Sequence, residues 1–335
     1  MAQLFGRPVE QARSYLGALE QVARVDSFVE ADGPARGSRR LRMVNGGGLE
    51  IDVHPDRALD LGQVTVDGIP VAWMEARGVQ GPADLDPNNG DWLRAWGGGM
   101  LTTCGLDAYG SPSRDDGRDF GQHGRVSGIP ARLTVAKVGQ GELVVEGVVR
   151  QTVLGGENLA LHRRITTAIG SKELTLTDVV TNEGAHEAVH MMLYHANFGW
   201  PLVEDGVALA LPSTVVEPRD EVAAAGLGSW ADIEPPSPSN LPQVFLHEFP
   251  EGHEVVVRVD NRRRGLAMQL KFDRRQLPWL CHWKCFADRT YVLGLEPMNT
   301  RTVVSRAEAR RQGALQFLQP GQSVTYQLSF GFEHG

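Results

Sequence analysis

The sequence is poor in cysteine. Three cysteines, Cys104, Cys281 and Cys285, occur among 335 residues. This number is too small for a disulfide framework, and it is odd, so at least one thiol would stay unpaired. Free thiols are typical of a reducing compartment. We therefore expect three reduced cysteines.

Long apolar runs and concentrated positive charge are also lacking. No stretch reaches the about 18 apolar residues that a membrane span needs. The first 25 residues contain no basic head followed by an apolar run, so no secretion signal is expected, and the cytoplasm is the expected location. The formal charge is −8, and the one basic cluster, RGSRRLR at residues 36–42, is short. These features argue against a membrane or nucleic-acid partner.

Familiar cofactor motifs are missing. The chain has no Gly-x-Gly-x-x-Gly between a strand and a helix, no phosphate-binding loop and no Gly-x-Ser-x-Gly elbow. The segment CHWKC offers Cys281, His282 and Cys285 to a metal, but a zinc site needs a further ligand at a workable spacing. In a strand Cys281 and Cys285 share one face, which favours a buried thiol pair. No cofactor or metal is expected.

Strand signals dominate the rest of the chain. Short segments with alternating apolar and polar residues, separated by turn residues, run from about residue 40 to the end. In residues 157–169 (ENLALHRRITTAI), for example, Leu159, Leu161 and Arg163 share one face. Helical signals are confined to a short helix near Pro8 to Leu19 and one turn near the C-terminus. We predict an N-terminal extension over residues 1–25 and one all-β domain over residues 26–335, with residues 223–242 as a long internal loop.

Two strand ends carry polar residues that a core does not need. In HMMLYHANFGWPL, His195 and Asn197 lie among aromatic residues, and a buried polar atom without a partner costs about 1–3 kcal/mol. In YVLGLEPMN, Glu296 follows an apolar strand. Desolvation there would raise the pKa of the carboxyl group and make it a better base near neutrality.

These segments resemble the aldose 1-epimerase (galactose mutarotase-like) superfamily, and within it the branch known as DUF4432. The resemblance spans roughly residues 40 to 332, and the matching segments occur in the same order. They are PDRALDLG, GGGMLTTCGLDAYG, HGRVSGIPA, YHANFGWPL and LPWLCHWK followed by YVLGLEPMN.

The resemblance implies a fold and an acid/base pair. The expected fold is a large antiparallel β-sandwich, the galactose mutarotase-like supersandwich, with the site in a concave cleft on one sheet. YHANFGWP matches the strand end that carries the general acid, and GLEPMN matches the one that carries the general base. The acid role thus falls to His195 and the base role to Glu296. The upstream His-Gly motif implies a substrate contact for His123.

Two family features lack a clean match. The classical enzymes have an arginine in an Asn-Arg-Ile motif, where this chain has TTCGLDAYG, so Arg57 and Arg125 are the candidates to replace it. The family aspartate that holds sugar hydroxyls is also missing, and His247, in VFLHEF, lies in the nearest segment. Further substrate-binding candidates are Asn197, Trp200, Trp283 and Lys284.

The function expected from this resemblance is the interconversion of sugar anomers by acid/base ring opening, without a cofactor. The expected partner is a monosaccharide, neutral or anionic, and a homodimer is compatible with the sequence. Two other functions remain open at this point. The chain could be a carbohydrate-binding protein without turnover, because a fold does not guarantee chemistry. It could also be a sugar isomerase or lyase that uses the same pair.

Overall fold

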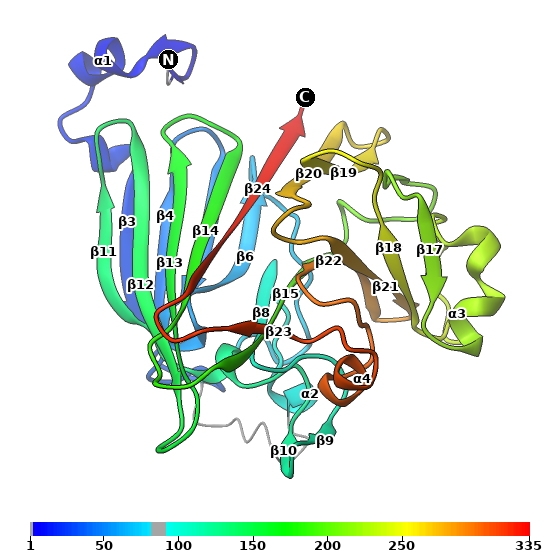
Figure 1. The fold of residues 1–335 in the computed structure, drawn as a ribbon. Helices are drawn as coiled ribbons and strands as arrows, with labels where there is room; N and C mark the ends of the chain where they lie inside the picture. Colours follow the sequence, from blue (N-terminus) through cyan, green and yellow to red (C-terminus); the bar gives the residue numbers. More distant parts are fainter. Residues whose placement is uncertain (1–2, 82–91) are drawn as a thin grey trace.

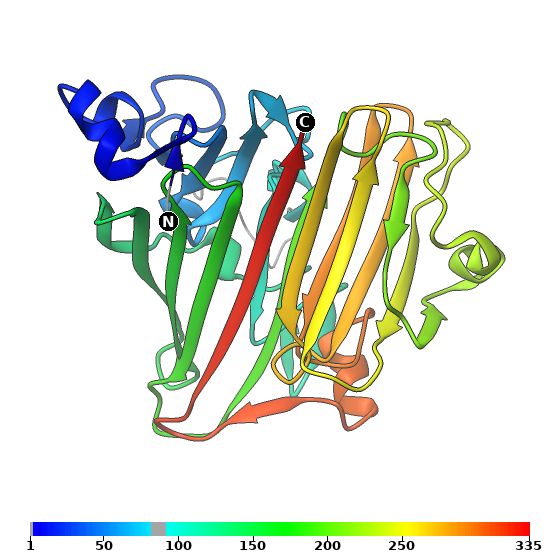
Figure 2. The ribbon, with the colours of Figure 1, turned by 90° about the horizontal axis from the view of Figure 1, so that it is seen from above.

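Two large antiparallel sheets make up the protein in the computed structural model, which describes residues 3–81 and 92–335 (Figure 1). The first sheet has eight strands, and β24 lies near its middle, where Figure 2 shows it in red. Its strands, in order across the sheet, are β11 (Arg132–Val138), β12 (Glu142–Thr152), β13 (Asn158–Ala168), β14 (Glu173–Asn182), β24 (Ser323–His334), β20 (Leu266–Asp273), β19 (Glu254–Asn261) and β16 (Ala208–Ala210).

The second sheet carries the residues of interest. Its order is β17 (Val215–Pro218), β18 (Gln243–Glu248), β21 (Trp279–Ala287), β22 (Thr290–Met298), β15 (Ala188–Phe198), β8 (Leu101–Leu106), β6 (Asp60–Val66), β5 (Leu49–His54), β4 (Arg39–Val44) and β3 (Arg24–Val29). Two short strands, β7 (Ile69–Pro70) and β23 (Gln316–Leu318), pair with β6 and β15. The predicted all-β sandwich is confirmed.

The remaining elements are short. Two small hairpins are formed by β1 (Gln3–Leu4) with β2 (Arg7–Pro8) and by β9 (Ser113–Asp115) with β10 (Arg118–Phe120). The α-helices are α1 (Val9–Ala12), α2 (Trp92–Ala95), α3 (Glu221–Ala225) and α4 (Arg306–Arg311), and the 3-10 turns are η1 (Arg13–Tyr15), η2 (Leu19–Gln21), η3 (Pro55–Arg57), η5 (Val126–Gly128) and η6 (Leu227–Ser229). The helix expected near Pro8 to Leu19 is therefore broken into α1 and two 3-10 turns.

The main core lies between the two sheets, and the buried side chain of Arg163 links one sheet to the other across it. Arg163 on β13 is fully buried and donates to Asp178 on β14 at 2.9 and 2.7 Å. It also donates to Asp60 on β6 in the other sheet at 2.9 Å and to the hydroxyl of Thr103 on β8 at 2.8 Å. Tyr194 on β15 donates to Asp178 at 2.8 Å. This network ties the two sheets together directly behind the strand that carries His195.

A second apolar cluster covers the outer face of the twelve-stranded sheet. Strand alternation sends Tyr194 into the core between the sheets and its neighbours Leu193 and His195 to this outer face. The cluster continues through Cys281 on β21 and Met298 on β22, and Figure 1 shows α2 and α4 on the same side of the molecule. The candidate site lies in this outer cluster.

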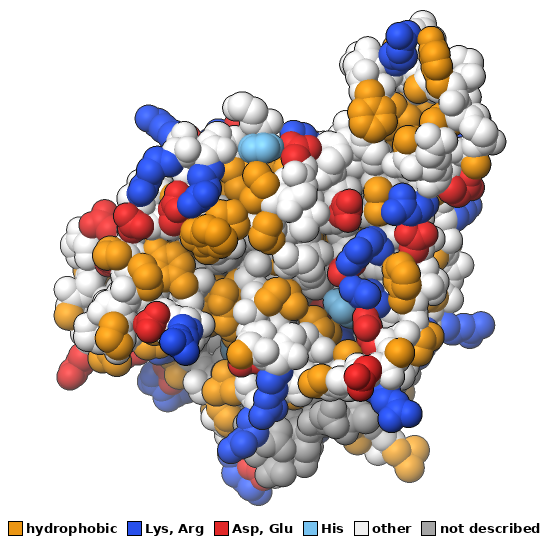
Figure 3. All heavy atoms as spheres, turned by 180° about the vertical axis from the view of Figure 1, so that it is seen from behind, with side chains coloured by type: hydrophobic (Ala, Val, Ile, Leu, Met, Phe, Trp, Pro, Cys, Tyr) orange, Lys and Arg blue, Asp and Glu red, His pale blue; other side chains and the backbone are white. Residues whose placement is uncertain are grey.

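The N-terminal segment stands apart from the body, as Figures 1 and 3 show. Its hydrophobic side chains are partly exposed: Phe5 is 81% exposed and Tyr15 is 71% exposed. Leu4, by contrast, is buried against Gly46. Strand β3 begins at Arg24, two residues before the boundary expected at residue 26.

Candidate functional site

Strand register places His195 beside Glu296. Strands β15 and β22 are antiparallel neighbours, with Leu193 opposite Met298 and Ala196 opposite Leu295. The same register sets His195 opposite Glu296, and both side chains point to the outer face. The imidazole Nε2 lies 3.4 Å from the carboxyl Oε1. Two residues that are 101 positions apart in the chain thus form one buried pair.

Burial controls the protonation of this pair. His195 is 5% exposed and Glu296 is 2% exposed. Desolvation lowers the pKa of His195 to about 4. Desolvation also raises the pKa of Glu296 to about 8, although a hydrogen bond from Cys281 and the charge of Arg219 act in the opposite direction. Between these two values the pair holds one transferable proton, which rests on the carboxyl group in the ligand-free site.

Two neighbours on the same face make room for Glu296 and contact it. Gly294 lies two residues earlier on β22, and a Cβ atom there would lie 2.6 Å from Glu296 Oε1 and 3.0 Å from Trp283 Cβ. A larger residue at position 294 would displace the carboxyl group or the indole. Cys281 is the register partner of Glu296 on β21, and its thiol is hydrogen-bonded to the carboxyl group.

The His-Gly segment brings a second histidine to the site. His123 has a φ of +57°, and its ring centroid lies 5.4 Å from that of His195. The next residue, Gly124, has a φ of +75°, and a Cβ atom there would lie 2.3 Å from the carbonyl oxygen of Ala108. Glycine is therefore required after His123. Burial lowers the pKa of His123 well below its usual value, so this ring is neutral near pH 7.

Three tryptophans surround the histidines. Trp92 and Trp96 stack with ring centroids 5.1 Å apart, and Trp96 lies 5.8 Å from Trp283. His195 is 5.0 Å from Trp96 and 5.5 Å from Trp283. The indole of Trp96 is oriented by a 2.9 Å hydrogen bond that it donates to Thr102. Flat apolar surfaces of this kind can pack against the apolar faces of a sugar ring.

A cavity of about 230 Å³ opens between these residues. It is smaller than the roughly 300–1,000 Å³ of pockets for drug-sized ligands, which favours a small ligand. Four buried polar atoms of its lining find no hydrogen-bond partner among the residues that the structure describes: Trp92 Nε1, His123 Nδ1, His195 Nδ1 and Glu296 Oε1. Because unpaired buried groups are costly, these atoms are candidates to bind the hydroxyl groups of a ligand.

Four of the ten residues proposed from the sequence therefore line one cavity, namely His195, Glu296, His123 and Trp283. The other six do not line it. Each of them has a different role that the structure explains.

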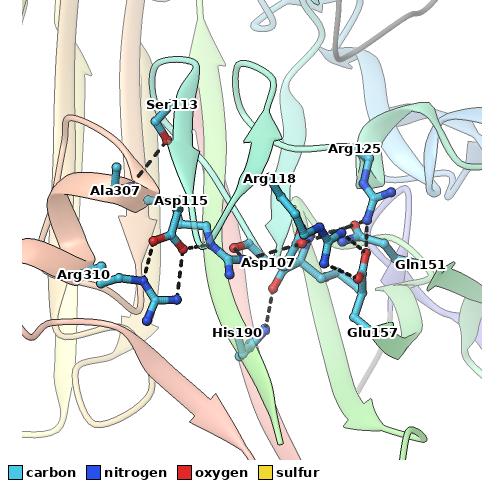
Figure 4. Close-up of polar contacts among 12 residues, drawn as sticks. Asp107, Ser113, Asp115, Arg118, Arg125, Gln151, Glu157, His190, Ala307 and Arg310 are labelled. Atoms are coloured by element: carbon cyan, nitrogen blue, oxygen red, sulfur yellow. Dashed lines mark hydrogen bonds and ion pairs between the residues drawn. The ribbon is translucent and has the colours of Figure 1, made fainter. Parts of the chain in front are cut away.

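The two arginines proposed as replacements for the family arginine are engaged elsewhere. Arg125 pairs with the carboxylate of Glu157, which also accepts from Arg118 at 3.0 Å, and Figure 4 shows both guanidinium groups turned toward it. Arg57 is buried and donates to the carbonyl groups of Ser127, Ala95 and Gln80 at 2.7, 3.2 and 3.4 Å. Their expected substrate contacts are thus replaced by structural ones.

Asn197 and Trp200 also lie outside the cavity. The Asn197 amide donates to the carbonyl groups of Gly99 and His195, at 3.0 and 2.9 Å, and so fixes the backbone of the histidine. Trp200 is 61% exposed in the turn after β15, where the guanidinium carbon of Arg264 lies 5.1 Å from its ring centroid.

Lys284 and His247 point to the opposite face of the sheet. Because side chains alternate along a strand, Trp283 and Lys284 cannot both face the cavity. Lys284 donates to Glu234 at 3.1 Å and to the Ser229 carbonyl at 3.0 Å. His247 lies 2.7 Å from the hydroxyl of Ser213.

Several lining residues were not proposed from the sequence. They are Trp92, Leu93, Trp96, Tyr109, Gly110, Ser111, Gln122, Leu193, Arg219, Val244, Cys281 and Val303. Most of them belong to connecting segments whose spacing carries no periodic signal. The exceptions lie in strands: Leu193 in β15, Val244 in β18 and Cys281 in β21. Strand alternation already placed Cys281 on the same face as Trp283.

Within residues 3–81 and 92–335, no group of three or more His, Cys, Asp or Glu side chains is arranged to hold a metal ion. The helices of the same residues include none that is long and apolar enough to cross a membrane.

Solved structures of proteins named as aldose 1-epimerases or galactose mutarotase-like proteins have the same fold. A "putative aldose 1-epimerase" from Klebsiella pneumoniae superposes with a TM-score of 0.85 at 26% identity, over 92% of this chain and 83% of that one. A galactose mutarotase-like protein from Clostridium acetobutylicum gives 0.67 at 13% identity, over 94% and 100%. Galactose 1-epimerase from Lactobacillus acidophilus gives 0.62 at 12% identity, over 93% and 99%. The last two likenesses concern the fold alone.

No curated protein matches the sequence significantly. One family profile, described as a domain of unknown function, DUF4432, matches residues 35–332. This range includes every residue of the cavity and all strands of the two sheets except β3 and the last two residues of β24. The chain belongs to the DUF4432 family, whose fold here is that of the galactose mutarotase-like proteins.

Proposed function

We propose that the protein interconverts the anomers of a monosaccharide by acid/base ring opening, with His195 as the acid and Glu296 as the base. The observation that supports this most is the 3.4 Å separation of the two groups in a small aromatic cavity. The hydroxyl group that loses a proton and the ring oxygen that gains one are bonded to the same sugar carbon. The acid and the base must therefore be close neighbours, as this pair is.

The reaction follows from the proton count. Glu296 removes the proton of the anomeric hydroxyl group while His195 delivers a proton to the ring oxygen, and the bond between the ring oxygen and the anomeric carbon breaks. The open-chain aldehyde rotates about the bond to its second carbon. Ring closure on the other face returns both protons. The cycle begins and ends with one proton on the pair.

The working state has this proton on His195. The same single proton rests on Glu296 in the ligand-free site, because burial disfavours both charges. Its transfer creates an imidazolium beside a carboxylate, and their attraction at 3.4 Å offsets part of the desolvation cost. The ring opening thus needs no proton from outside the pair.

The test is NMR exchange spectroscopy between the anomers of a panel of neutral and acidic sugars. His195→Ala and Glu296→Gln should each lower the enzymatic exchange rate by about 10²–10⁴-fold, the usual contribution of a general acid or base. The double variant should be scarcely slower than either single one, since the two groups act as a unit.

Two residues directly before β15 provide matched control variants. His186 and Glu187 are exposed and remote from the cavity lining, so His186→Ala and Glu187→Gln should keep the wild-type rate. Sugar binding without faster exchange in any sugar would refute the proposal and support a binding protein. New product signals would refute it in favour of an isomerase or lyase.

A further inference from the structure

The charged groups of the cavity are unevenly distributed. Among its described lining residues, Arg219 is the one cationic side chain other than histidine, and Glu296 is the one carboxyl group. The pKa of Glu296 is raised to about 8 by burial, so this group is mostly uncharged at pH 7. Both lining histidines have lowered pKa values and are neutral as well. Arg219 therefore carries the one permanent charge among the described lining residues, and its carboxylate partner, Asp220, lies outside the lining.

Arg219 lies near the pair but does not bind it. Its charge lowers the pKa values of Glu296 and Cys281, so it is close enough to act on both groups. No ion pair joins it to Glu296 within the part of the chain that the structure describes. Both residues line the same cavity, so a ligand that contacts Glu296 at one end can extend toward Arg219 with another substituent.

The backbone and one edge of the Arg219 guanidinium are fixed. The backbone N–H of Arg219 donates to the carbonyl of Val244, which also lines the cavity. Its Nε and Nη2 atoms contact Asp220 Oδ2 at 3.0 and 2.9 Å. Asp220 is itself held by the N–H of Ala223, which donates to Oδ1 at 3.0 Å.

Within residues 3–81 and 92–335, Asp220 is the one side chain that contacts the Arg219 guanidinium through a hydrogen bond or ion pair, and it leaves the edge formed by Nη1 and the outer N–H of Nη2 open. Two parallel N–H groups on one edge of a guanidinium match the two oxygens of a carboxylate, phosphate or sulfonate. The side chain of Arg219 is 35% exposed, so it stands where the cavity meets solvent. A charged substituent can bind there while the sugar ring stays in the aromatic interior.

We propose that Arg219 selects an anionic monosaccharide, one whose ring contacts His195 and Glu296 and whose carboxylate, phosphate or sulfonate group binds the free edge of the guanidinium. This inference rests on the proposed function for the position of the ring. It adds the substrate class and a residue that determines it.

The experiment compares sugars in pairs of equal stereochemistry: glucose, galactose and mannose against their 6-carboxylates, 6-phosphates and 6-sulfonates. Dissociation constants are measured by calorimetry, and KM and kcat for anomer exchange by NMR. Wild type should bind the charged member of the preferred pair about 10–100-fold more tightly, the usual value of a charge-assisted hydrogen bond. The three anionic series identify which group is recognised.

Arg219→Gln should remove this preference through KM and the dissociation constant, while kcat changes little. Arg219→Lys should restore part of it, because lysine keeps the charge but not the two-pronged geometry. The matched control is Arg150→Gln, which removes an exposed arginine that pairs with Glu183 in the other sheet. Its preference should equal that of wild type.

The results separate the two proposals. A preference that Arg219→Gln abolishes, without faster exchange of any sugar, would support the inference and refute the proposed function. Two outcomes with fast anomer exchange would overturn the inference and leave the proposed function standing. In the first, wild type binds neutral and charged sugars with equal affinity. In the second, the preference for charged sugars survives Arg219→Gln. Failure of every charged sugar to bind would also overturn the inference.

Discussion

At the scale of single residues, the site consists of groups whose protonation is set by burial. A histidine with a pKa of about 4 and a glutamic acid with a pKa of about 8 would be unremarkable on their own, since burial disfavours charge on either. Their proximity makes them a unit that gains and loses protons as a pair. Shifts of this kind in a cavity are typical of functional sites.

The pH dependence of anomer exchange follows from the same values. Below about pH 4 both groups are protonated and no base remains, and above about pH 8 both have lost their protons and no acid remains. The rate above the uncatalysed background should therefore be bell-shaped, with limits near these two values. NMR exchange rates between pH 3 and 10, corrected for the buffer reaction, measure the profile.

The variant Cys281→Ala tests whether Glu296 sets the alkaline limit of this profile. Its hydrogen bond favours the charged carboxylate of Glu296, so Cys281→Ala should raise that pKa and move the alkaline limit upward. The assignment of the alkaline limit to Glu296 would be contradicted if Cys281→Ala left this limit unchanged, or if the rate stayed constant through pH 8.

Residue chemistry could be predicted from the sequence only in part. Polar side chains at two strand ends, together with the family resemblance, singled out His195 and Glu296, and register then brought them together. Strand alternation would have excluded one of the pair Trp283 and Lys284 at once. The position of Trp200 had no such guide, because the strand ends two residues before it, at Phe198.

At the scale of elements, strands were predictable and connections were not. Alternation in β13 correctly placed Arg163 on the face of Leu159 and Leu161, which is buried. Helix α2 has four residues and Arg219 follows a four-residue strand, so neither has a detectable period. What these segments contribute to the cavity depends on long-range packing, which local patterns do not encode.

The Arg163 network predicts a large loss of stability when its cation is removed. Arg163→Met would leave Asp60 and Asp178 buried without their partner, which typically costs about 3–5 kcal/mol. Urea unfolding at pH 7 measures the loss.

Arg164→Met is the matched control, since the neighbouring arginine is 44% exposed and pairs with Glu142 on the solvent side. Exposed pairs contribute about 0–1 kcal/mol. Equal losses for the two variants would contradict a special role for the buried network.

At the scale of the whole molecule, the N-terminal segment and the cavity lie at opposite ends. Figure 1 shows the N-terminus at one end of the sheets and α2 and α4 at the other. The family match begins at residue 35, after this segment. The segment is therefore expected to support stability and to have no part in the chemistry.

Deletion of residues 1–22 tests this expectation. It removes buried Leu4, whose burial contributes about 1.5–3 kcal/mol, so the melting temperature should fall by roughly 2–4 °C. The anomer exchange rate at 25 °C should remain that of the full chain. A variant that melts normally but exchanges slowly would show that the segment acts on the site.

The division of the cavity between strands and connections has a consequence for how such proteins diversify. His195 and Glu296 are held by backbone pairing that cannot slip without exchanging the two faces of the sheet. Arg219, Trp92 in α2 and Trp96 just after it belong to segments that can change in length and sequence while that pairing persists. Under the proposed function, one acid/base pair could thus serve different sugars when only the segments at the border of the cavity change.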